Sequence, residues 1–247
     1  GTPNILFVAG ATKSAILAAV SAQGETRVTG AFTGGPVRDL CLFLRSMGAD
    51  IEGEGGTTLR IRPGRSLRGG TYRLPFDPLV LGTYVAATGA TRGAITCGNA
   101  TIRDDNPDVR AFREMGIELE NDDGHRVHVS CKGRLRPSFL STETINTDIG
   151  PMFAVLLSLA DGQGALEEVI WEQRFRYADG LRQMGGWNRV DGRTLHIRGV
   201  PSLRAADGEA TELRSAAALI LAAMSAPGRS RIQAVHHLRR GYEDLPG

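Results

Sequence analysis

The sequence has 247 residues, of which 41% are hydrophobic and 23% charged, as is usual for a soluble globular protein of one or two domains. A net charge of +2 is too small to indicate a nucleic-acid-binding surface. The sequence contains no run of 18 apolar residues, so no transmembrane helix is expected. The first ten residues lack the basic segment and apolar length of a signal peptide, so we expect a cytoplasmic protein with no membrane partner.

Taken in chain order, four alanine-rich segments have apolar residues at spacings of three and four, which predicts helices. These segments are residues 14–22, 81–90, 151–160 and 214–226. Glycine follows each of them, as at many helix ends. A short β-rich run comes next, at residues 26–29, 94–97, 165–170 and 230–235.

A second amphipathic helix is predicted after the β-rich runs, for example over residues 39–47 and 107–115. Two further strands then close the unit, as at residues 50–52 and 58–62. The resulting order is a βαβαββ-like unit of about 70 residues. One such unit cannot bury its apolar faces alone, so we expect the units to stack around a shared core.

Two sets of landmarks support the repeat. The segments that end the second helices read Arg-x-Met-Gly, and their methionines, Met47, Met115 and Met184, are 68 and 69 residues apart. The glycines that end the first helices recur at intervals of 69, 69 and 66 residues, at positions 24, 93, 162 and 228. A shared period in two independent markers predicts a mixed α/β repeat fold.

The cysteines and the basic residues indicate which kinds of site the chain can form. Cys41, Cys97 and Cys131 are an odd number with wide spacing, which argues against a disulfide framework and against a zinc site. All basic residues except Lys13 and Lys132 are arginines. Codon bias accounts for such a preference, but a guanidinium fork also matches phosphate and carboxylate groups.

Four short segments of the chain read like known motifs. ATELRSA at residues 210–216 is similar to ATDLRASA, and HLRRGYE at residues 237–243 is similar to HIDRGYE. EQRF at residues 172–175 is similar to ENRF, and NTDI at residues 146–149 stands in the place of PTDMQ. These motifs belong to the bacterial UDP-N-acetylglucosamine enolpyruvyl transferases, within the enolpyruvyl transferase and EPSP synthase family, which the chain therefore resembles. The matches occur in order along nearly the whole chain.

The resemblance implies two domains, each an inside-out α/β barrel of three units. Residues 1–70 would be the last unit of the first domain, and residues 71–247 would form most of the second domain. The other units of the first domain would be missing partners in the same protein, and both ends of this chain would be truncated. The reactive cysteine of the family belongs to that missing part, so its role passes to no cysteine here.

The implied reaction transfers the enolpyruvyl group of phosphoenolpyruvate to the 3-hydroxyl of UDP-N-acetylglucosamine and releases phosphate, with no cofactor and no metal. Asp148 is the candidate base, and a helix N-cap is the alternative for an aspartate just before an apolar helix. Arg240, beside Gly241, is the second candidate catalytic residue, with a surface turn as its alternative. His237 in the same turn is more often a structural residue.

The other candidate residues would bind substrate. Arg214 opens a helix whose dipole opposes a cation, which suggests a bound anion, although a solvated surface arginine is the alternative. Residues 10–14 are interpreted as a glycine-led loop entering a helix, where an anion could bind, with capping by Thr12 as the alternative. The candidate substrate-binding residues are Arg214, Arg174, Glu172, Gly10, Thr12, Lys13, Thr147, Ile170, Trp171 and Glu212.

Departures from the family motifs fall mainly in the nucleotide pocket. Val8 replaces a serine that contacts the nucleotide phosphates, and Lys13 could supply that contact instead. Arg239 stands for an aspartate and Trp171 for a phenylalanine, and residues 77–80 read Asp-Pro-Leu-Val where the family has arginine and glutamate. Three alternatives stay open: transfer to another nucleotide in antibiotic biosynthesis, a nucleotide-binding module without turnover, and a structural repeat protein.

Overall fold

The computed structural model describes residues 5–63, 66–122, 124–171 and 174–243. The chain divides into two compact units, Gly1–Pro75 and Phe76–Gly247. Assigning these units to two domains of a longer protein stays a prediction. Within the described residues, no helix combines the length and apolar character needed to cross a membrane.

The first unit is one helix–strand–helix–hairpin repeat. It comprises α1 (Ile5–Ala19), β1 (Thr26–Thr29), α2 (Gly35–Ser46), β2 (Asp50–Glu52) and β3 (Thr58–Arg62). The strands form an antiparallel sheet in the order β1-β3-β2. Alternation along β3 turns Leu59 and Ile61 into the core, where they meet Ile16 of α1 and Cys41 of α2.

The predicted glycine-led loop at residues 10–14 is wrong. Helix α1 begins at Ile5, so Gly10, Thr12 and Lys13 lie inside it. Because no proline interrupts this apolar run, the helix continues through Gly10, and residues 10–14 do not have the free N–H groups of a helix start. Thr12 does not cap the helix, since its buried hydroxyl accepts a hydrogen bond from the backbone N–H of Phe32 at 3.1 Å.

The second unit repeats the same order of elements. Its first part has α3 (Pro78–Thr91), β4 (Ala94–Gly98), α4 (Pro107–Glu114), β5 (Glu118–Asn121) and β6 (Arg126–Ser130). Its next part has β7 (Phe139–Ser141), α5 (Gly150–Ser158), β8 (Gln163–Glu167), α6 (Tyr177–Gln183), β9 (Trp187–Asp191) and β10 (Thr194–Arg198). Its last part has β11 (Asp207–Glu209), α7 (Leu213–Ser225), β12 (Arg231–Gln233) and the 3₁₀ helix η1 (Val235–Arg240).

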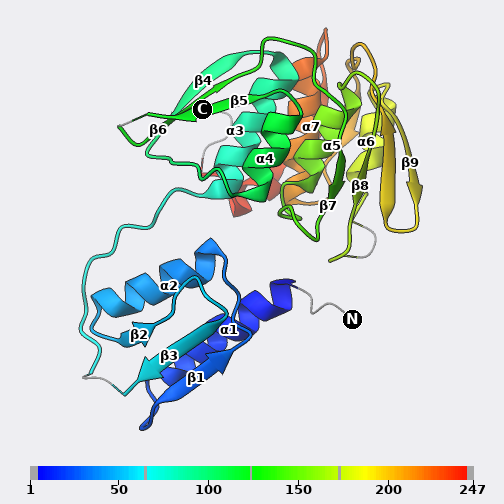
Figure 1. Cartoon of the computed structure of the whole chain (residues 1–247). Coiled ribbons are helices and arrows are strands. Elements are labelled where there is room, and N and C mark those ends of the chain that lie inside the picture. Colours follow the sequence, from blue (N-terminus) through cyan, green and yellow to red (C-terminus); the bar gives the residue numbers. More distant parts are fainter. Residues whose placement is uncertain (1–4, 64–65, 123, 172–173, 244–247) are drawn as a thin grey trace. The chain divides into compact units, whose positions relative to one another are not determined.

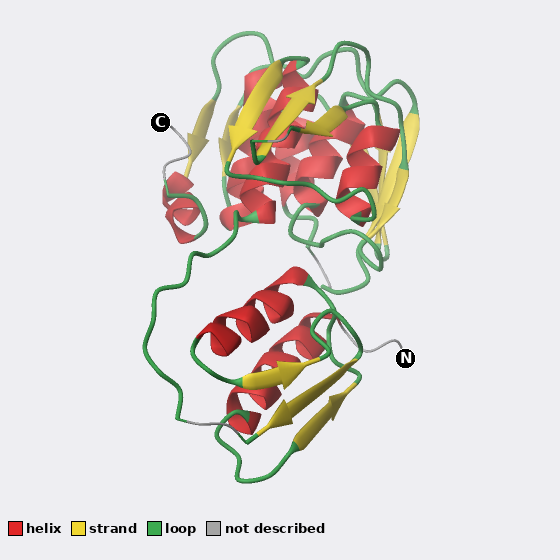
Figure 2. Cartoon of the chain, turned by 60° about the vertical axis from the view of Figure 1, so that its left-hand side comes forward, coloured by secondary structure: helices red, strands yellow, loops and turns green. Residues whose placement is uncertain are grey.

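Helices α3, α5 and α7 pack against one another in the middle of this unit, and the strands lie around them (Figures 1 and 2). Every residue of α5 is buried, which is what a helix that is apolar on all sides requires. Phe153 of α5 stacks on Phe112 of α4 with ring centroids 4.4 Å apart. The predicted mixed α/β fold, an inside-out barrel with helices within and sheets without, is therefore confirmed for this unit.

Each part of the second unit contributes its own sheet. The order β4-β6-β5 is antiparallel throughout and matches the order in the first unit. In the order β7-β8-β10-β9, only β7 and β8 are parallel. Strands β11 and β12 are also parallel. A strand before the first helix of a repeat thus pairs in parallel with the strand that follows that helix, as in a βαβ unit.

The Arg-x-Met-Gly landmark is the end of the second helix. Gly48, Gly116 and Gly185 have φ values of 104°, 97° and 85°, which favour glycine. Their N–H groups donate at 2.9 Å to the carbonyls of the landmark arginines at positions 45, 113 and 182. The methionine carbonyls in turn accept N–H groups at 2.9 Å from Arg68, Arg136 and Arg204. The sequence period therefore reflects a conserved backbone arrangement within the chain.

Candidate active site

The loop before α5 carries Asp148 and is fixed from two sides. The Asn146 side chain accepts the backbone N–H of Asp148 at 2.9 Å. The Asn146 N–H itself donates to Oδ1 of Asp108, in the first turn of α4, at 2.8 Å. Burial raises the pKa of the Asp108 carboxyl above its usual value, while the hydrogen bond from Asn146 lowers it. One repeat thus anchors the acidic loop of the next.

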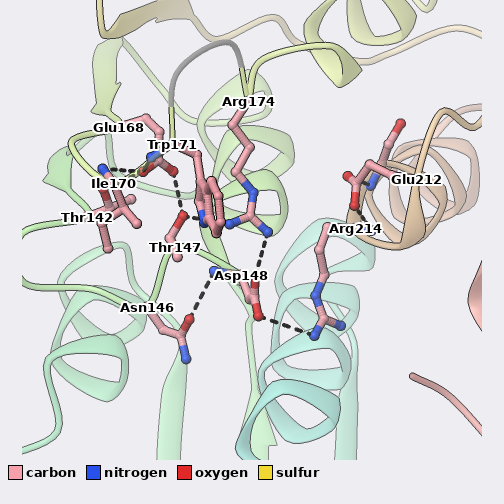
Figure 3. A network of polar contacts seen from close by, with 11 residues as sticks. Thr142, Asn146, Thr147, Asp148, Glu168, Ile170, Trp171, Arg174, Glu212 and Arg214 are labelled. Carbon is pink, nitrogen blue, oxygen red and sulfur yellow. Dashed lines mark hydrogen bonds and ion pairs between the residues drawn. The ribbon is translucent and has the colours of Figure 1, made fainter. Parts of the chain in front are cut away.

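Asp148 faces two arginines from different elements (Figure 3). Arg174, in the segment before α6, donates from Nη2 to Oδ1 of Asp148. Nη2 of Arg214, in the first turn of α7, lies 3.6 Å from Oδ2. Helix α5 begins without a side-chain cap, so the capping alternative for Asp148 is wrong. The Asp148 side chain keeps 33% of its surface exposed and is open to a ligand.

A buried carboxylate, that of Glu168, is connected to Arg174 through the Thr147 hydroxyl. Glu168 is only 3% exposed and accepts hydrogen bonds from the hydroxyls of Thr142 and Thr147, at 2.9 and 2.6 Å. Its Oε1 also accepts the backbone N–H groups of Ile170 and Trp171, at 2.8 and 3.0 Å. Ile170 and Trp171 therefore contribute their backbone here, and the Trp171 side chain remains 46% exposed.

Arg214 is buried, with 8% of its surface exposed, so the reading as a solvated surface arginine is wrong. The Glu212 carboxylate caps α7 by accepting the N–H groups of Arg214 and Ser215, at 2.9 and 2.6 Å. The Arg214 guanidinium lies 6.0 Å from the centre of the Tyr242 ring. The Tyr242 hydroxyl shares a hydrogen bond of 2.7 Å with Thr83 of α3. Helices α3 and α7 together thus support this cation.

Tyr242 links the turn that follows α7 to Arg214 of the site. Arg240 is exposed on η1, and its side chain has no ion pair or hydrogen bond to the described residues. The structure therefore brings Asp148, Thr147, Arg174 and Arg214 together but leaves Arg240 outside their contacts. The rings of His237 and His236 lie with their centroids 4.2 Å apart and are tilted by 36°.

The remaining candidates fall in the first unit or outside the described residues. Gly10, Thr12 and Lys13 belong to the first unit, and Glu172 falls outside the described residues. Within the described ranges, no group of three or more His, Cys, Asp or Glu side chains could hold a metal ion.

Sequence reasoning missed Glu168, Asp108 and Asn146. Glu167 and Glu168 interrupt the apolar residues of the predicted strand at 165–170. Neighbouring residues of a strand point to opposite faces, so one of the two acids was expected to face inward. That was the available signal for Glu168. Tyr177 of α6 was also missed: it is buried, and desolvation together with the nearby Glu168 carboxylate raises the pKa of its hydroxyl.

Comparisons with known proteins agree with this fold. Residues 7–247 match the family EPSP synthase (3-phosphoshikimate 1-carboxyvinyltransferase). The UDP-N-acetylglucosamine 1-carboxyvinyltransferase of Clostridium botulinum is 36% identical over 98% of this chain and 59% of its own length. That of Gluconobacter oxydans is 37% identical over 96% of this chain and 57% of its own length. The enolpyruvyl transferase NikO from Streptomyces tendae aligns with a TM-score of 0.85 at 30% identity, over 96% of this chain and 57% of that one.

Inner helices surrounded by sheets, together with the repeated order of elements, define a repeat-built α/β barrel protein. The chain belongs to the EPSP synthase family. It spans less than two thirds of the length of the curated relatives that it matches.

Proposed function

We propose that the protein containing this chain transfers the enolpyruvyl group of phosphoenolpyruvate to the 3-hydroxyl of UDP-N-acetylglucosamine. The hydroxyl oxygen bonds to C2 of phosphoenolpyruvate while C3 takes up a proton. C3 then loses a proton as the C2–O bond to phosphate breaks, so a vinyl ether and inorganic phosphate are the products. In bacteria this sugar derivative enters peptidoglycan synthesis.

One observation carries the proposal: the half-open Asp148 carboxylate lies between the guanidinium groups of Arg174 and Arg214. The reaction requires a base that takes the proton of the acceptor hydroxyl, and the exposed part of the Asp148 carboxylate is accessible to such a hydroxyl. The reaction also requires cations that bind the carboxylate and the phosphate of phosphoenolpyruvate, and guanidinium groups are suited to both. We assign Asp148 as the base and Arg214 as a phosphoenolpyruvate ligand.

Arg240 is assigned to phosphoenolpyruvate as well. Its side chain is exposed and makes no ion pair or hydrogen bond with the described residues, so an arriving anion would not have to displace a partner. The adjacent Gly241 lets the backbone approach a ligand closely. The acceptor would meet the segment around Ile170 and Trp171.

The identity of the acceptor rests on the curated relatives, which act on UDP-N-acetylglucosamine by name. A second acceptor class is favoured by two observations together. The solved enolpyruvyl transferase NikO aligns with a TM-score of 0.85, and this chain departs from the family motifs mainly around the nucleotide. Transfer to another nucleotide in antibiotic biosynthesis is therefore the alternative substrate assignment.

The test is an assay of the full-length protein for phosphate release from phosphoenolpyruvate, with UDP-N-acetylglucosamine and other nucleotides offered in parallel. Release that requires UDP-N-acetylglucosamine supports the proposal. Release only with another nucleotide supports the alternative. If nucleotides bind but none of them supports phosphate release from phosphoenolpyruvate, the protein is a nucleotide-binding module without turnover.

A further inference from the structure

Glu168 has no assigned role in the proposed reaction, yet it is the most buried acid next to the candidate base. It lies just beyond the end of β8, and its carboxylate is surrounded by four donors (Figure 3). Burial of a carboxylate is costly unless hydrogen bonds replace the lost water, and four such bonds do so here. The arrangement is thus a fully satisfied polar network rather than an accidental contact.

The chemistry of the donors fixes the direction of every bond in this network. The Thr142 hydroxyl accepts the N–H of Val169 at 2.9 Å, so its proton points to Glu168. Arginine can only donate, so the Thr147 hydroxyl accepts from Nη1 of Arg174 at 2.8 Å. The single proton of Thr147 must therefore go to Oε2 of Glu168, at 2.6 Å.

These directions connect Glu168 to the candidate base. Thr147 can accept from Arg174 because Glu168 takes the Thr147 proton. Nη1 of Arg174 is held by Thr147, and its Nη2 is directed at Asp148. A planar guanidinium held at one nitrogen has its other nitrogen placed as well. The carboxylate of Glu168 thus sets the orientation of a cation that it does not touch.

We propose that Glu168 is a positioning residue which, through Thr147, orients Arg174 and holds Asp148 for reaction. The proposal rests on the function proposed above. The proposal requires that both oxygens of the Glu168 side chain accept hydrogen bonds. A group of the same shape that also donates will therefore not replace the carboxylate.

Glu168→Gln tests this requirement directly. Oε1 has three donors and Oε2 only one, so the glutamine carbonyl takes the place of Oε1 and its NH₂ faces Thr147. Thr147 then receives a donor from glutamine and another from Arg174, while its own proton loses its acceptor. We expect the Arg174 guanidinium to leave Thr147.

The experiment uses the full-length protein with Glu168→Gln, Thr147→Val, Thr147→Ser and the matched control Thr142→Val. Thr142→Val also removes a buried hydroxyl from Glu168, but on the oxygen that does not face Thr147. We expect kcat/KM for phosphoenolpyruvate to fall about 10- to 100-fold in Glu168→Gln and Thr147→Val. Thr147→Ser should restore it, and Thr142→Val should stay within about threefold of the parent at a similar loss of Tm.

Crystal structures of the parent and of Glu168→Gln complete the test. The inference predicts that Arg174 moves away from Thr147 in the variant. It is overturned if Arg174 does not move, if kcat/KM is unchanged, or if Thr142→Val lowers kcat/KM as much as Glu168→Gln does. If the parent itself releases no phosphate, the proposed function fails, and the position of Arg174 in the two structures alone decides for or against Glu168.

Discussion

Nη2 of Arg214 lies 3.6 Å from Oδ2 of Asp148, although one residue opens helix α7 and the other precedes α5. Arg174 occupies the other oxygen of the same carboxylate. Two guanidinium groups from different elements thus converge on one partly exposed carboxylate. The inner helices create the pair, since α5 and α7 pack directly against each other.

Replacement of Arg214 should weaken the binding of phosphoenolpyruvate more than the binding of the acceptor. We expect Arg214→Ala to lower kcat/KM for phosphoenolpyruvate about 100-fold, because a buried cation with a ligand-binding fork is lost. Arg214→Lys keeps the charge but loses the fork and should fall between the parent and Arg214→Ala. Steady-state kinetics of the full-length variants measure both. Equal effects on phosphoenolpyruvate and on the acceptor would contradict the assignment.

The role of Arg240 can be separated from general surface charge, because Arg239 beside it is also exposed. Arg240→Ala should raise KM for phosphoenolpyruvate about tenfold or more while the acceptor KM changes little. Arg239→Ala, with the same loss of charge, should stay within about twofold of the parent. Identical responses of the two variants would put Arg240 outside the site.

Packing of the inner helices should dominate the stability of the second unit. Phe153 is 0% exposed and stacks on Phe112, so Phe153→Ala should lower the free energy of unfolding by about 3–5 kcal/mol. Phe139 is 80% exposed, and Phe139→Ala should change it by no more than about 0.5 kcal/mol. Denaturant unfolding of both variants measures the difference, and a small loss in Phe153→Ala would refute the packing account.

Much of the fold could be predicted from the sequence because local rules decide it. Apolar spacing located the first helices of the repeats, and the Met-Gly landmarks located the ends of the second ones. The boundary of β8 could not be predicted in this way. Residues 165–170 have the composition of a strand, but β8 ends at Glu167 because the next residues turn their N–H groups onto the Glu168 carboxylate. That turn depends on a tertiary network, which residue spacing does not encode.

The candidate site was predictable to a similar degree. Motif resemblance identified Asp148, Arg174 and Arg214, because these side chains occur within recognisable segments. The supporting residues Asp108 and Glu168 were missed, because each acts on a segment from another part of the chain. For Glu168, the pair of acids within an apolar segment was the only signal in the sequence. The prediction for residues 10–14 is wrong for a simpler reason: a single glycine inside an apolar helix costs only about 1 kcal/mol, so Gly10 does not interrupt α1.

Asp122, in the turn between β5 and β6, should titrate at unusually low pH. Desolvation raises its pKa, but hydrogen bonds from the Arg126 side chain and from the N–H groups of Gly124 and Arg126 outweigh this and lower it to about 2. Because the folded-state pKa is depressed, this carboxylate stabilises the fold above the ordinary value of 3.8, and that contribution disappears as pH falls toward 2. Carboxyl ¹³C NMR should give a midpoint near 2. Arg126→Ala should raise the midpoint, and a parental value at or above 3.8 would contradict the assignment.

The central claim is that Asp148 serves as the base, and phosphate release by Asp148→Asn in the full-length protein tests it most directly. Asparagine keeps the shape of the side chain but cannot accept the hydroxyl proton. We predict that turnover falls about 10³-fold while binding of the acceptor nucleotide, measured by calorimetry, stays within about threefold of the parent. Turnover at the parental rate would contradict the account.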